Sequence, residues 1–203
     1  MRCRRLTRSS DSTDRVDVQG YLDSCVLYPS RLRSLLMRLA ITGLYRARWT
    51  NLIHEEWMRN VLRDYPDVTL EQVARTRDLM DAYVLDSIVT GHESLIESLV
   101  LPDPDDRHVL AAAIVGHADA IVTFNLKDFP AGQLHPHHVE AIHPDAFLQA
   151  QFDLSADAVC AAVKDDRESL KKWPHDADQY LDKLERGGLP GFVALLRQHR
   201  DRL

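Results

Sequence analysis

The sequence predicts an α/β fold with a central parallel sheet, followed by a small helical C-terminal extension. A predicted helix over residues 104–116 runs almost directly into an apolar segment of strand length at 120–124. A helix that leads straight into a buried strand is typical of parallel α/β domains. Beyond Pro144 the pattern is helical throughout. The chain has 203 residues, of which 45% are hydrophobic, which is sufficient for one full domain and a smaller appendage.

The N-terminal elements follow from composition and periodicity. Residues 1–15 are rich in Arg and Ser and are predicted to form a flexible leader. In residues 16–22, Val and Leu alternate with polar residues; this predicts a strand, interrupted by Gly20, that ends at Asp23. Leucines at helical spacing predict a helix over 32–39, which Gly43 ends. A short strand is expected at 45–49.

Thr50 is predicted to cap the next helix, whose apolar stripe is formed by Ile53, Trp57 and Val61 and which ends at Pro66. Two more helices are expected at 69–90, capped by Thr69, and at 92–99. A last strand is predicted at 139–142. Pro174, Gly187 and Gly188 divide the tail into helices at 145–152, 155–172, 176–186 and 190–202. The predicted organisation is a leader (1–15), an α/β domain (16–145) and a helical extension (146–203).

Composition excludes several classes of protein. No apolar run approaches the roughly 18 residues that cross a bilayer, and no apolar block follows the basic leader, so neither a membrane protein nor a signal peptide is expected. Three widely spaced cysteines without a CxxC motif favour a reducing cytoplasm over a disulfide framework. The net charge is −6, yet residues 24–54 contain no acid and five arginines: Arg31, Arg33, Arg38, Arg46 and Arg48.

Asp106 is a candidate functional acid because of its place on a helix. It shares the stripe of Val109, Leu110 and Ala113, so its carboxylate is expected on the core-facing side. A buried carboxylate without a partner is costly, and a metal ion would compensate it. The alternative is that the acids at 103–106 only cap the helix; this is the expected role of Asp103 and Asp105.

The same comparison separates two acids of the preceding helix. Glu56 lies at the edge of the apolar stripe and can reach a cleft, whereas Glu55 is expected to face water. The alternative is a solvated pair beside Arg59. Three further polar residues follow predicted strands, where ligand sites of open parallel sheets lie, although each could be a turn former. These residues are Asp23, Asn125 and Asp128.

Carboxylates from separate segments of the chain indicate a site for a hard cation. Mg²⁺ prefers oxygen ligands and is usually held by a few carboxylates and water. Converging carboxylates also repel one another, so they are expected to hold protons or cations until the metal binds.

Three segments resemble the PIN-domain nucleases. They are LDSCVLYPSRLRSLLMRLA, RWTNLIHEEWMRN and PDDRHVLAAAIVGHADAIVTFNLKDFP. The similarity covers about residues 16–145, and DDRHVLAAAI followed by TFNLKDF is its most specific part. Within that family the chain looks most like the bacterial VapC-like toxins, one branch of which has a similar helical tail. The resemblance implies a three-layer α/β/α sandwich with acids gathered at the carboxyl end of the sheet.

The family's acids fall on named positions of this sequence. The first falls on Asp23, the second on Glu56 and the third on Asp106. The fourth falls on Asn125 or Asp128; many relatives have Asp where Asn125 stands, and we favour Asp128 with Asn125 assisting. Thr123 matches the hydroxyl residue that steadies the site, and Cys25 replaces a frequent Asn.

The resemblance implies an Mg²⁺- or Mn²⁺-dependent endoribonuclease that hydrolyses RNA phosphodiester bonds, in which the metal activates water and polarises the phosphate. It also implies an antitoxin partner and makes a homodimer plausible. The arginines of residues 24–54 are candidate phosphate contacts, with Arg31, Arg33, Arg46 and Arg48 foremost; solvated helix faces are the alternative.

Two competing hypotheses remain at this point. One is a PIN-like RNA- or protein-binding module that has lost turnover. The presence of Asn125 and the polar first strand favour this hypothesis. The other is a zinc site in the histidine-rich loop, against which the irregular spacing and the lack of a cysteine speak. The histidines are His135, His137, His138 and His143. Cys25 is expected to be a packing residue, since no histidine partner is evident.

Overall fold

A parallel four-stranded sheet lies at the centre of the molecule, as predicted. The computed structural model describes residues 18–171 and 175–203, so the predicted leader and the first two residues of the predicted first strand lie outside the described residues. The strand order is β2-β1-β3-β4, and every neighbouring pair is parallel. The strands are β1 (Gln19–Leu22), β2 (Arg46–Arg48), β3 (Ala120–Val122) and β4 (Glu140–Ile142).

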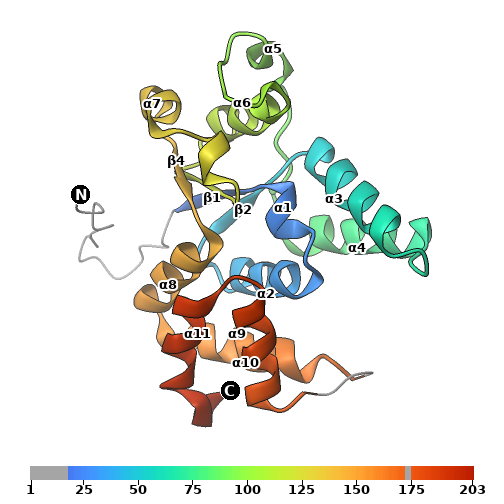
Figure 1. The fold of residues 1–203 in the computed structure, drawn as a ribbon, viewed down its shortest axis with the longest axis vertical. Helices are drawn as coiled ribbons and strands as arrows, with labels where there is room; N and C mark the ends of the chain where they lie inside the picture. The colour runs from blue at the N-terminus through green and yellow to red at the C-terminus, as the bar shows by residue number, and fades with distance from the viewer. Residues whose placement is uncertain (1–17, 172–174) are drawn as a thin grey trace.

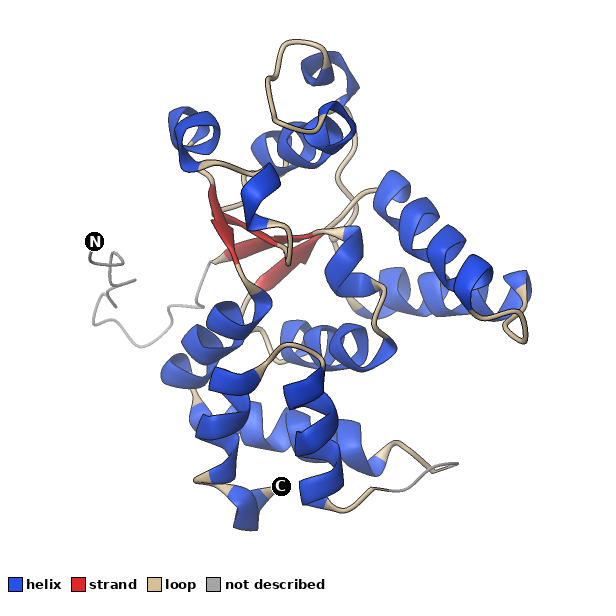
Figure 2. Cartoon of the chain, viewed as in Figure 1, coloured by secondary structure: helices blue, strands red, loops and turns tan. Residues whose placement is uncertain are grey.

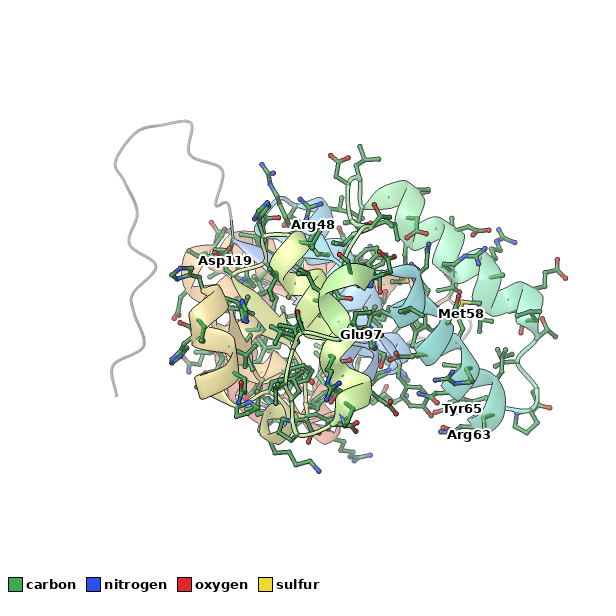
Figure 3. The ribbon with its side chains drawn as sticks, turned by 90° about the horizontal axis from the view of Figure 1, so that it is seen from above. Arg48, Met58, Arg63, Tyr65, Glu97 and Asp119 are labelled. Carbon is green, nitrogen blue, oxygen red and sulfur yellow. The ribbon has the colours of Figure 1, made fainter. Side chains whose placement is uncertain are left out.

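Helices cover both sides of this sheet, which gives the three-layer α/β/α arrangement (Figure 1; Figure 2). Helix α6 lies on one side, and α2 with the C-terminal helices lies on the other. Helices α3 and α4 form a pair that projects from the body, with Arg63 and Tyr65 at the far end of α3 (Figure 3). The helices of this part of the chain are α1 (Ser24–Leu27), α2 (Ser30–Ile41), α3 (Asn51–Asp64), α4 (Leu70–Tyr83), α5 (Glu93–Ile96), α6 (Arg107–Val115) and α7 (Ala131–Leu134).

The register of the two central strands fixes what lies at the carboxyl end of the sheet. Leu22 of β1 is opposite Val122 of β3, so Asp23 and Thr123 leave the sheet side by side. The backbone N–H of Asp23 donates to the carbonyl of Val122 at 3.2 Å, which extends the pairing by one step. The first candidate acid is therefore anchored to the sheet through its own backbone.

Gly20 does not interrupt β1; it makes room for a helix. A Cβ at this position would lie 3.4 Å from the rings of both Phe147 and Tyr45. These two rings pack edge to face, with centroids 4.9 Å apart. Gly20 thus permits the close approach of α8 (Pro144–Leu154) to the sheet, which explains the residue that weakened the strand pattern in the sequence.

The predicted helix over 69–90 was too long. It begins as expected, since the Thr69 side chain accepts from the N–H of Gln72 in a capping box, but α4 ends at Tyr83. Asp86 then adopts a left-handed conformation (φ 58°), and Ile88 forms a parallel bridge with Trp49. The segment 88–90 is β-branched (Ile-Val-Thr), so pairing with a neighbouring strand prevails over continuation of the helix.

The C-terminal extension consists of α8 (Pro144–Leu154), α9 (Ala156–Glu168), α10 (Ala177–Arg186) and α11 (Pro190–Arg197). These helices match the four predicted pieces, with two differences at their ends. Helix α9 ends four residues before the end of the predicted helix at 155–172, and α11 ends five residues before the end of the predicted helix at 190–202, where a 3₁₀ turn follows at Arg200–Arg202. A buried carboxylate joins the extension to the α/β domain: Asp166 of α9 is 1% exposed and accepts hydrogen bonds from Ser34 and Arg38 of α2 and from Tyr180 of α10. No helix of the described part of the chain is long and apolar enough to span a membrane.

Candidate metal centre

Asp23 is held at the carboxyl end of β1 by two side-chain donors. It is 4% exposed, and its Oδ2 accepts a hydrogen bond of 2.6 Å from the Thr123 hydroxyl and one of 3.1 Å from the Cys25 thiol. Both contacts go to the same oxygen. The carboxylate therefore has a fixed orientation, and its Oδ1 is left for other ligands.

Thr123 links the ends of the two central strands. It is fully buried, and its Oγ1 accepts a hydrogen bond of 3.0 Å from the backbone N–H of Asn125 while it donates to Asp23. Asn125 thus supports the site through its backbone, and its side chain is exposed at the start of the turn that contains Asp128. The hydroxyl of Thr123 thus connects the end of β3 to the Asp23 carboxylate, and its steadying role at a metal site stays a prediction.

Glu56 approaches the centre from α3. It is partly buried, whereas Glu55 is exposed, as the helical stripe predicted. Its Oε1 lies 2.9 Å from Nε2 of His108 in α6. Burial favours a higher pKa for Glu56, but hydrogen bonds from His108 and Ser24 and the charges of His108 and Arg59 outweigh it and hold the pKa below its usual value. Glu56 is thus a carboxylate at neutral pH.

Asp106 has the opposite electrostatic surroundings. Burial and the negative charges of Asp23, Asp103 and Asp128 raise the pKa of its carboxyl group to about 7, and the charge of His108 offsets this only in part. Acids from three separate parts of the chain therefore act on this one group. Such mutual repulsion is the electrostatic signature expected of carboxylates that await a cation.

The donor chemistry of this centre fits a hard divalent cation, since oxygen atoms of carboxylates dominate it. Within residues 18–171 and 175–203, however, no group of three or more His, Cys, Asp or Glu side chains is gathered closely enough to hold a metal ion. In the proposed function a bound cation would have to bring these carboxylates together, and its positive charge would offset the repulsion that raises the pKa of Asp106.

The neighbouring acids have the simpler roles predicted for them. The Asp103 carboxylate accepts from the N–H of Asp105 at 2.9 Å and caps the 3₁₀ turn at Pro104–Asp106, which precedes α6. Asp105 is exposed in the first turn of this segment. Asp103 and Asp105 are exposed, whereas Asp106 is partly buried.

Most arginines of the acid-free stretch have partners within the protein. Arg33 donates to the carbonyls of Leu27 and Tyr28 and lies 4.4 Å from the ring of Trp57, and burial lowers its pKa to about 10. Arg38 binds Asp166 at 3.1 Å. The Arg31 guanidinium lies 5.8 Å from the ring of Tyr180.

The two arginines of β2 lie on another part of the surface. Arg48 donates to Gln19 at 3.0 Å and to the carbonyl of Asp86, while the side chain of Arg46 is exposed. Both line a groove of about 550 Å³ between the end of α2, β2 and residues 83–86. None of the four candidate acids is among the residues that line this groove.

Cys25 and the histidine-rich loop have local roles. Burial, and then the charge of Asp23, raise the pKa of the Cys25 thiol to about 12, so the residue is not a thiolate at neutral pH. In the loop, the side chains of His135, His137 and His138 are exposed. His143 accepts from the N–H of Asp145 and caps α8.

His108 is the residue of this centre that the sequence analysis missed. It follows Asp106 by two positions, and residues two apart on an α-helix do not share a face. Asp106, however, belongs to the 3₁₀ turn that precedes α6, so the geometry of a regular α-helix does not relate the two side chains. The motif DDRH places a histidine near a candidate acid. Helical periodicity does not detect this signal, because it only predicts which residues share a face.

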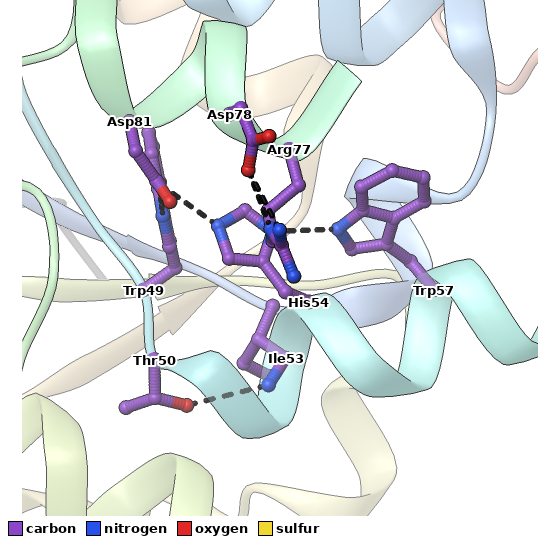
Figure 4. A network of polar contacts seen from close by, with 8 residues as sticks. All are labelled: Trp49, Thr50, Ile53, His54, Trp57, Arg77, Asp78 and Asp81. Carbon is purple, nitrogen blue, oxygen red and sulfur yellow. Dashed lines mark hydrogen bonds and ion pairs between the residues drawn. The ribbon is translucent and has the colours of Figure 1, made fainter. Parts of the chain in front are cut away.

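A buried network fixes α3, the helix that carries Glu56, against α4 (Figure 4). His54 is 1% exposed; its Nδ1 accepts from the indole N–H of Trp57 at 3.0 Å, and its Nε2 lies 3.0 Å from the Asp81 carboxylate. Trp49 donates to the same carboxylate at 3.0 Å. Burial lowers the pKa of His54, in keeping with a neutral ring that donates from Nε2. The second acid therefore stands on a rigid support.

These features define a class of protein: a parallel α/β sandwich with Asp23 at the carboxyl end of its sheet and with further acids whose charges act on one another. Residues 17–127 match the model of the PIN domain family, and residues 144–198 match the model described as the VapC50 C-terminal domain. The chain thus belongs to the PIN domain family, and its C-terminal extension is of the VapC50 type.

One curated relative supports this assignment. A protein of Mycobacterium tuberculosis (strain ATCC 25618 / H37Rv), named "Putative ribonuclease VapC50", is 41% identical over 93 residues, which are 46% of this chain. The match covers 54% of the relative, so it spans about half of the relative's length. No solved structure matches the chain at a significant level.

Proposed function

We propose that this protein is a divalent-metal-dependent endoribonuclease and the toxin of a toxin–antitoxin pair. Membership of the PIN domain family and the relative's printed name support a ribonuclease of the VapC type. The observation that carries the proposal is the state of Asp106, whose pKa of about 7 reflects burial and the charges of three other aspartates. An arrangement of mutually repelling carboxylates is unfavourable unless a cation completes it.

In this proposal Asp23, Glu56, Asp106 and Asp128 hold Mg²⁺ or Mn²⁺. When bound, the ion supplies an activated water molecule and neutralises charge on the scissile phosphate. Thr123 orients the Asp23 carboxylate through its 2.6 Å hydrogen bond. Asn125 in turn orients Thr123 through its backbone N–H.

Recognition of RNA is assigned to the acid-free stretch of the chain. Arg31, Arg33, Arg46 and Arg48 remain the proposed phosphate contacts. Arg31 is the strongest candidate for a phosphate contact, because it lies at the start of α2 and its guanidinium lies over the aromatic ring of Tyr180. Phosphate contacts of this kind make binding weaken steadily with salt concentration.

The proposed partners are the RNA substrate and an antitoxin protein that covers the acidic centre and the arginine-bearing helix. The proposed compartment is the cytoplasm, and a homodimer formed through the α/β domain is a further part of the proposal. These points extend the family assignment, and each can be tested on the purified protein.

The proposal is tested by incubating the protein with total RNA, with and without Mn²⁺, beside the Asp106→Asn variant. Asn keeps the size of the side chain but cannot supply the carboxylate charge, so we expect cleavage to fall on the order of 10³-fold, equivalent to several kcal/mol of transition-state stabilisation. Asp105→Asn is the matched control, since Asp105 is exposed in the same turn; it should cleave at the wild-type rate. Equal degradation by the wild type and Asp106→Asn contradicts the assignment.

One observation favours a second candidate, a PIN-like module that binds RNA or protein without turnover. The described residues contain no preassembled group of three metal-binding side chains. RNA binding without cleavage at every Mg²⁺ and Mn²⁺ concentration supports this candidate, whereas metal-dependent cleavage excludes it.

A further inference from the structure

Glu56 is tied to the helix that follows Asp106. Its Oε1 lies 2.9 Å from Nε2 of His108, and both side chains are largely shielded, at 26% exposed for Glu56 and 12% for His108. His108 stands in the first turn of α6, directly after the 3₁₀ turn that contains Asp106. One contact thus joins the second and third proposed ligands, although 50 positions separate them in the chain.

The direction of this hydrogen bond is fixed by chemistry. A carboxylate only accepts, so Nε2 of His108 must carry the proton that is donated to Glu56. The other ring nitrogen, Nδ1, is buried and has no hydrogen-bond partner in the described part of the chain. Glu56 therefore fixes the orientation of the ring, and the ring in turn restrains the Glu56 carboxylate, to which the Ser24 side chain also donates.

A glutamate has three rotatable bonds, and without restraint Glu56 would sample many positions around the centre. Second-shell hydrogen bonds of this kind orient metal ligands, and their loss typically lowers metal affinity about 10- to 100-fold. Because α6 directly follows the 3₁₀ turn that contains Asp106, the contact also holds α3 beside the segment that supplies the third acid.

We propose that His108 is a positioning residue that holds the Glu56 carboxylate ready for the divalent cation. This inference rests on the proposed metal-dependent function and deepens it. His108 acts through Glu56 and neither contacts the RNA nor binds the metal itself.

A neighbouring histidine provides a matched control. His92 is 3% exposed, and its two ring nitrogens have no hydrogen-bond partner among the described residues. It lies close enough to His108 to feel its charge, and its Nδ1 lies 3.9 Å from the Glu93 carboxylate. Replacing His92 removes a buried imidazole of the same size from the same region and keeps the contact of His108 with Glu56, so it is the control for lost packing.

The test is a titration of thermal stability with Mn²⁺, which measures binding without cleavage because a ligand that binds only the folded state stabilises it by RT ln(1 + L/Kd), where L is the concentration of free ligand. For His108→Leu we expect the Kd for Mn²⁺ obtained from the rise in Tm to increase tenfold or more. His108→Gln places an amide donor near the position of Nε2, and it should stay within about threefold of the wild type. His92→Leu should also stay within about threefold.

A parallel titration of RNA cleavage separates positioning from general damage. With His108→Leu, saturating Mn²⁺ should restore the rate to within a few-fold of the wild type, whereas structural damage would lower the rate at every concentration. If the leucine variant does not fold, His108→Asn takes its place, since its shorter side chain cannot place a donor at Nε2. An unchanged Mn²⁺ requirement, an equal rise for His92→Leu, or no rescue by Gln overturns the inference.

Two outcomes distinguish this inference from the proposed function. Mn²⁺ stabilisation that is lost in Asp106→Asn but unchanged in His108→Leu overturns the role of His108 alone. A wild-type protein that Mn²⁺ neither stabilises nor activates overturns both.

Discussion

Two aspartates of this protein, Asp166 and Asp106, are shielded from water in opposite ways. Asp166 is 1% exposed and accepts hydrogen bonds from Ser34, Arg38 and Tyr180, so its own chain compensates its charge. Asp106 is half-buried among other aspartates, and its pKa rises to about 7. The first carboxylate has its partners within the protein, whereas the second would, in the proposed function, be completed by a cation from outside.

The comparison distinguishes an aspartate with a structural role, Asp166, from one with a proposed functional role, Asp106. Asp166 joins α9 of the extension to α2 of the PIN domain, and removal of its charge should affect stability. Asp106 lies beyond the carboxyl end of the sheet, and removal of its charge should affect metal binding while it relieves repulsion. Substitutions at the two sites should therefore have opposite effects on the free energy of unfolding.

The largest effect on stability is expected at Asp166. Asp166→Ala leaves Arg38 without its partner and Tyr180 without its acceptor, so we expect a loss of about 3 kcal/mol in the free energy of unfolding. For a protein of this size this corresponds to a fall in Tm of roughly 6–12 °C. Urea and thermal unfolding measure both, with Asp165→Ala as the exposed control. A loss below about 1 kcal/mol would show that this carboxylate does not hold the extension in place.

A smaller loss in the free energy of unfolding is expected on replacing Thr123, whose hydrogen bond should contribute both to stability and to the proposed metal site. Thr123→Val removes a buried 2.6 Å hydrogen bond to the Asp23 carboxylate, so we expect a loss of about 2 kcal/mol and a higher Mn²⁺ requirement for cleavage. Thr123→Ser keeps the hydroxyl and should restore the Mn²⁺ requirement. Failure of Ser to restore it would argue that the methyl group, and not the hydroxyl, supports the site.

The pH dependence of stability gives the smallest effect and the sharpest contrast. The pKa of Asp106 is raised in the folded protein, so between about pH 4 and pH 7 the folded state holds a proton that the unfolded state has lost, and the contribution of Asp106 to stability falls as the pH rises through this range. Asp106 is partly exposed, so after allowance for solvent screening the effect is on the order of 1–2 kcal/mol.

Asp106→Asn should remove this dependence. In metal-free buffer we expect the variant to match the wild type near pH 4 and to exceed it at pH 8 by on the order of 1–2 kcal/mol in urea unfolding. Other titrating groups are common to both proteins and cancel in the difference. A variant that is less stable than the wild type at pH 8 would show that the Asp106 carboxylate has favourable partners in the folded state.

Features that depend on local sequence could be predicted, and they are confirmed. The caps at Thr50, Thr69 and Asp103 follow from side chains that bond to the next turn. The parallel sheet follows from an apolar strand that comes directly after a helix. The exposure of Glu55 and the partial burial of Glu56 follow from helical periodicity.

Features that depend on partners distant in sequence could not be predicted. The end of α4 at Tyr83 is set by the pairing of Ile88 with Trp49, and the contact of His108 with Glu56 joins two helices. The partners of Arg33 and Arg38 were likewise hidden, because a run of arginines without acids gives no sign that carbonyl groups and a distant aspartate bind them. Periodicity reports which face a residue occupies, and not what it meets there.

The most direct test of the account is the titration of the Asp106 carboxyl group by NMR, with and without Mg²⁺. We expect the pKa of Asp106 to lie near 7 in the metal-free protein and to fall clearly when Mg²⁺ is added, because a bound cation favours the charged form of the carboxyl group. A pKa near 4 without metal, or a pKa that Mg²⁺ leaves unchanged, would contradict the claim that these carboxylates form a metal centre.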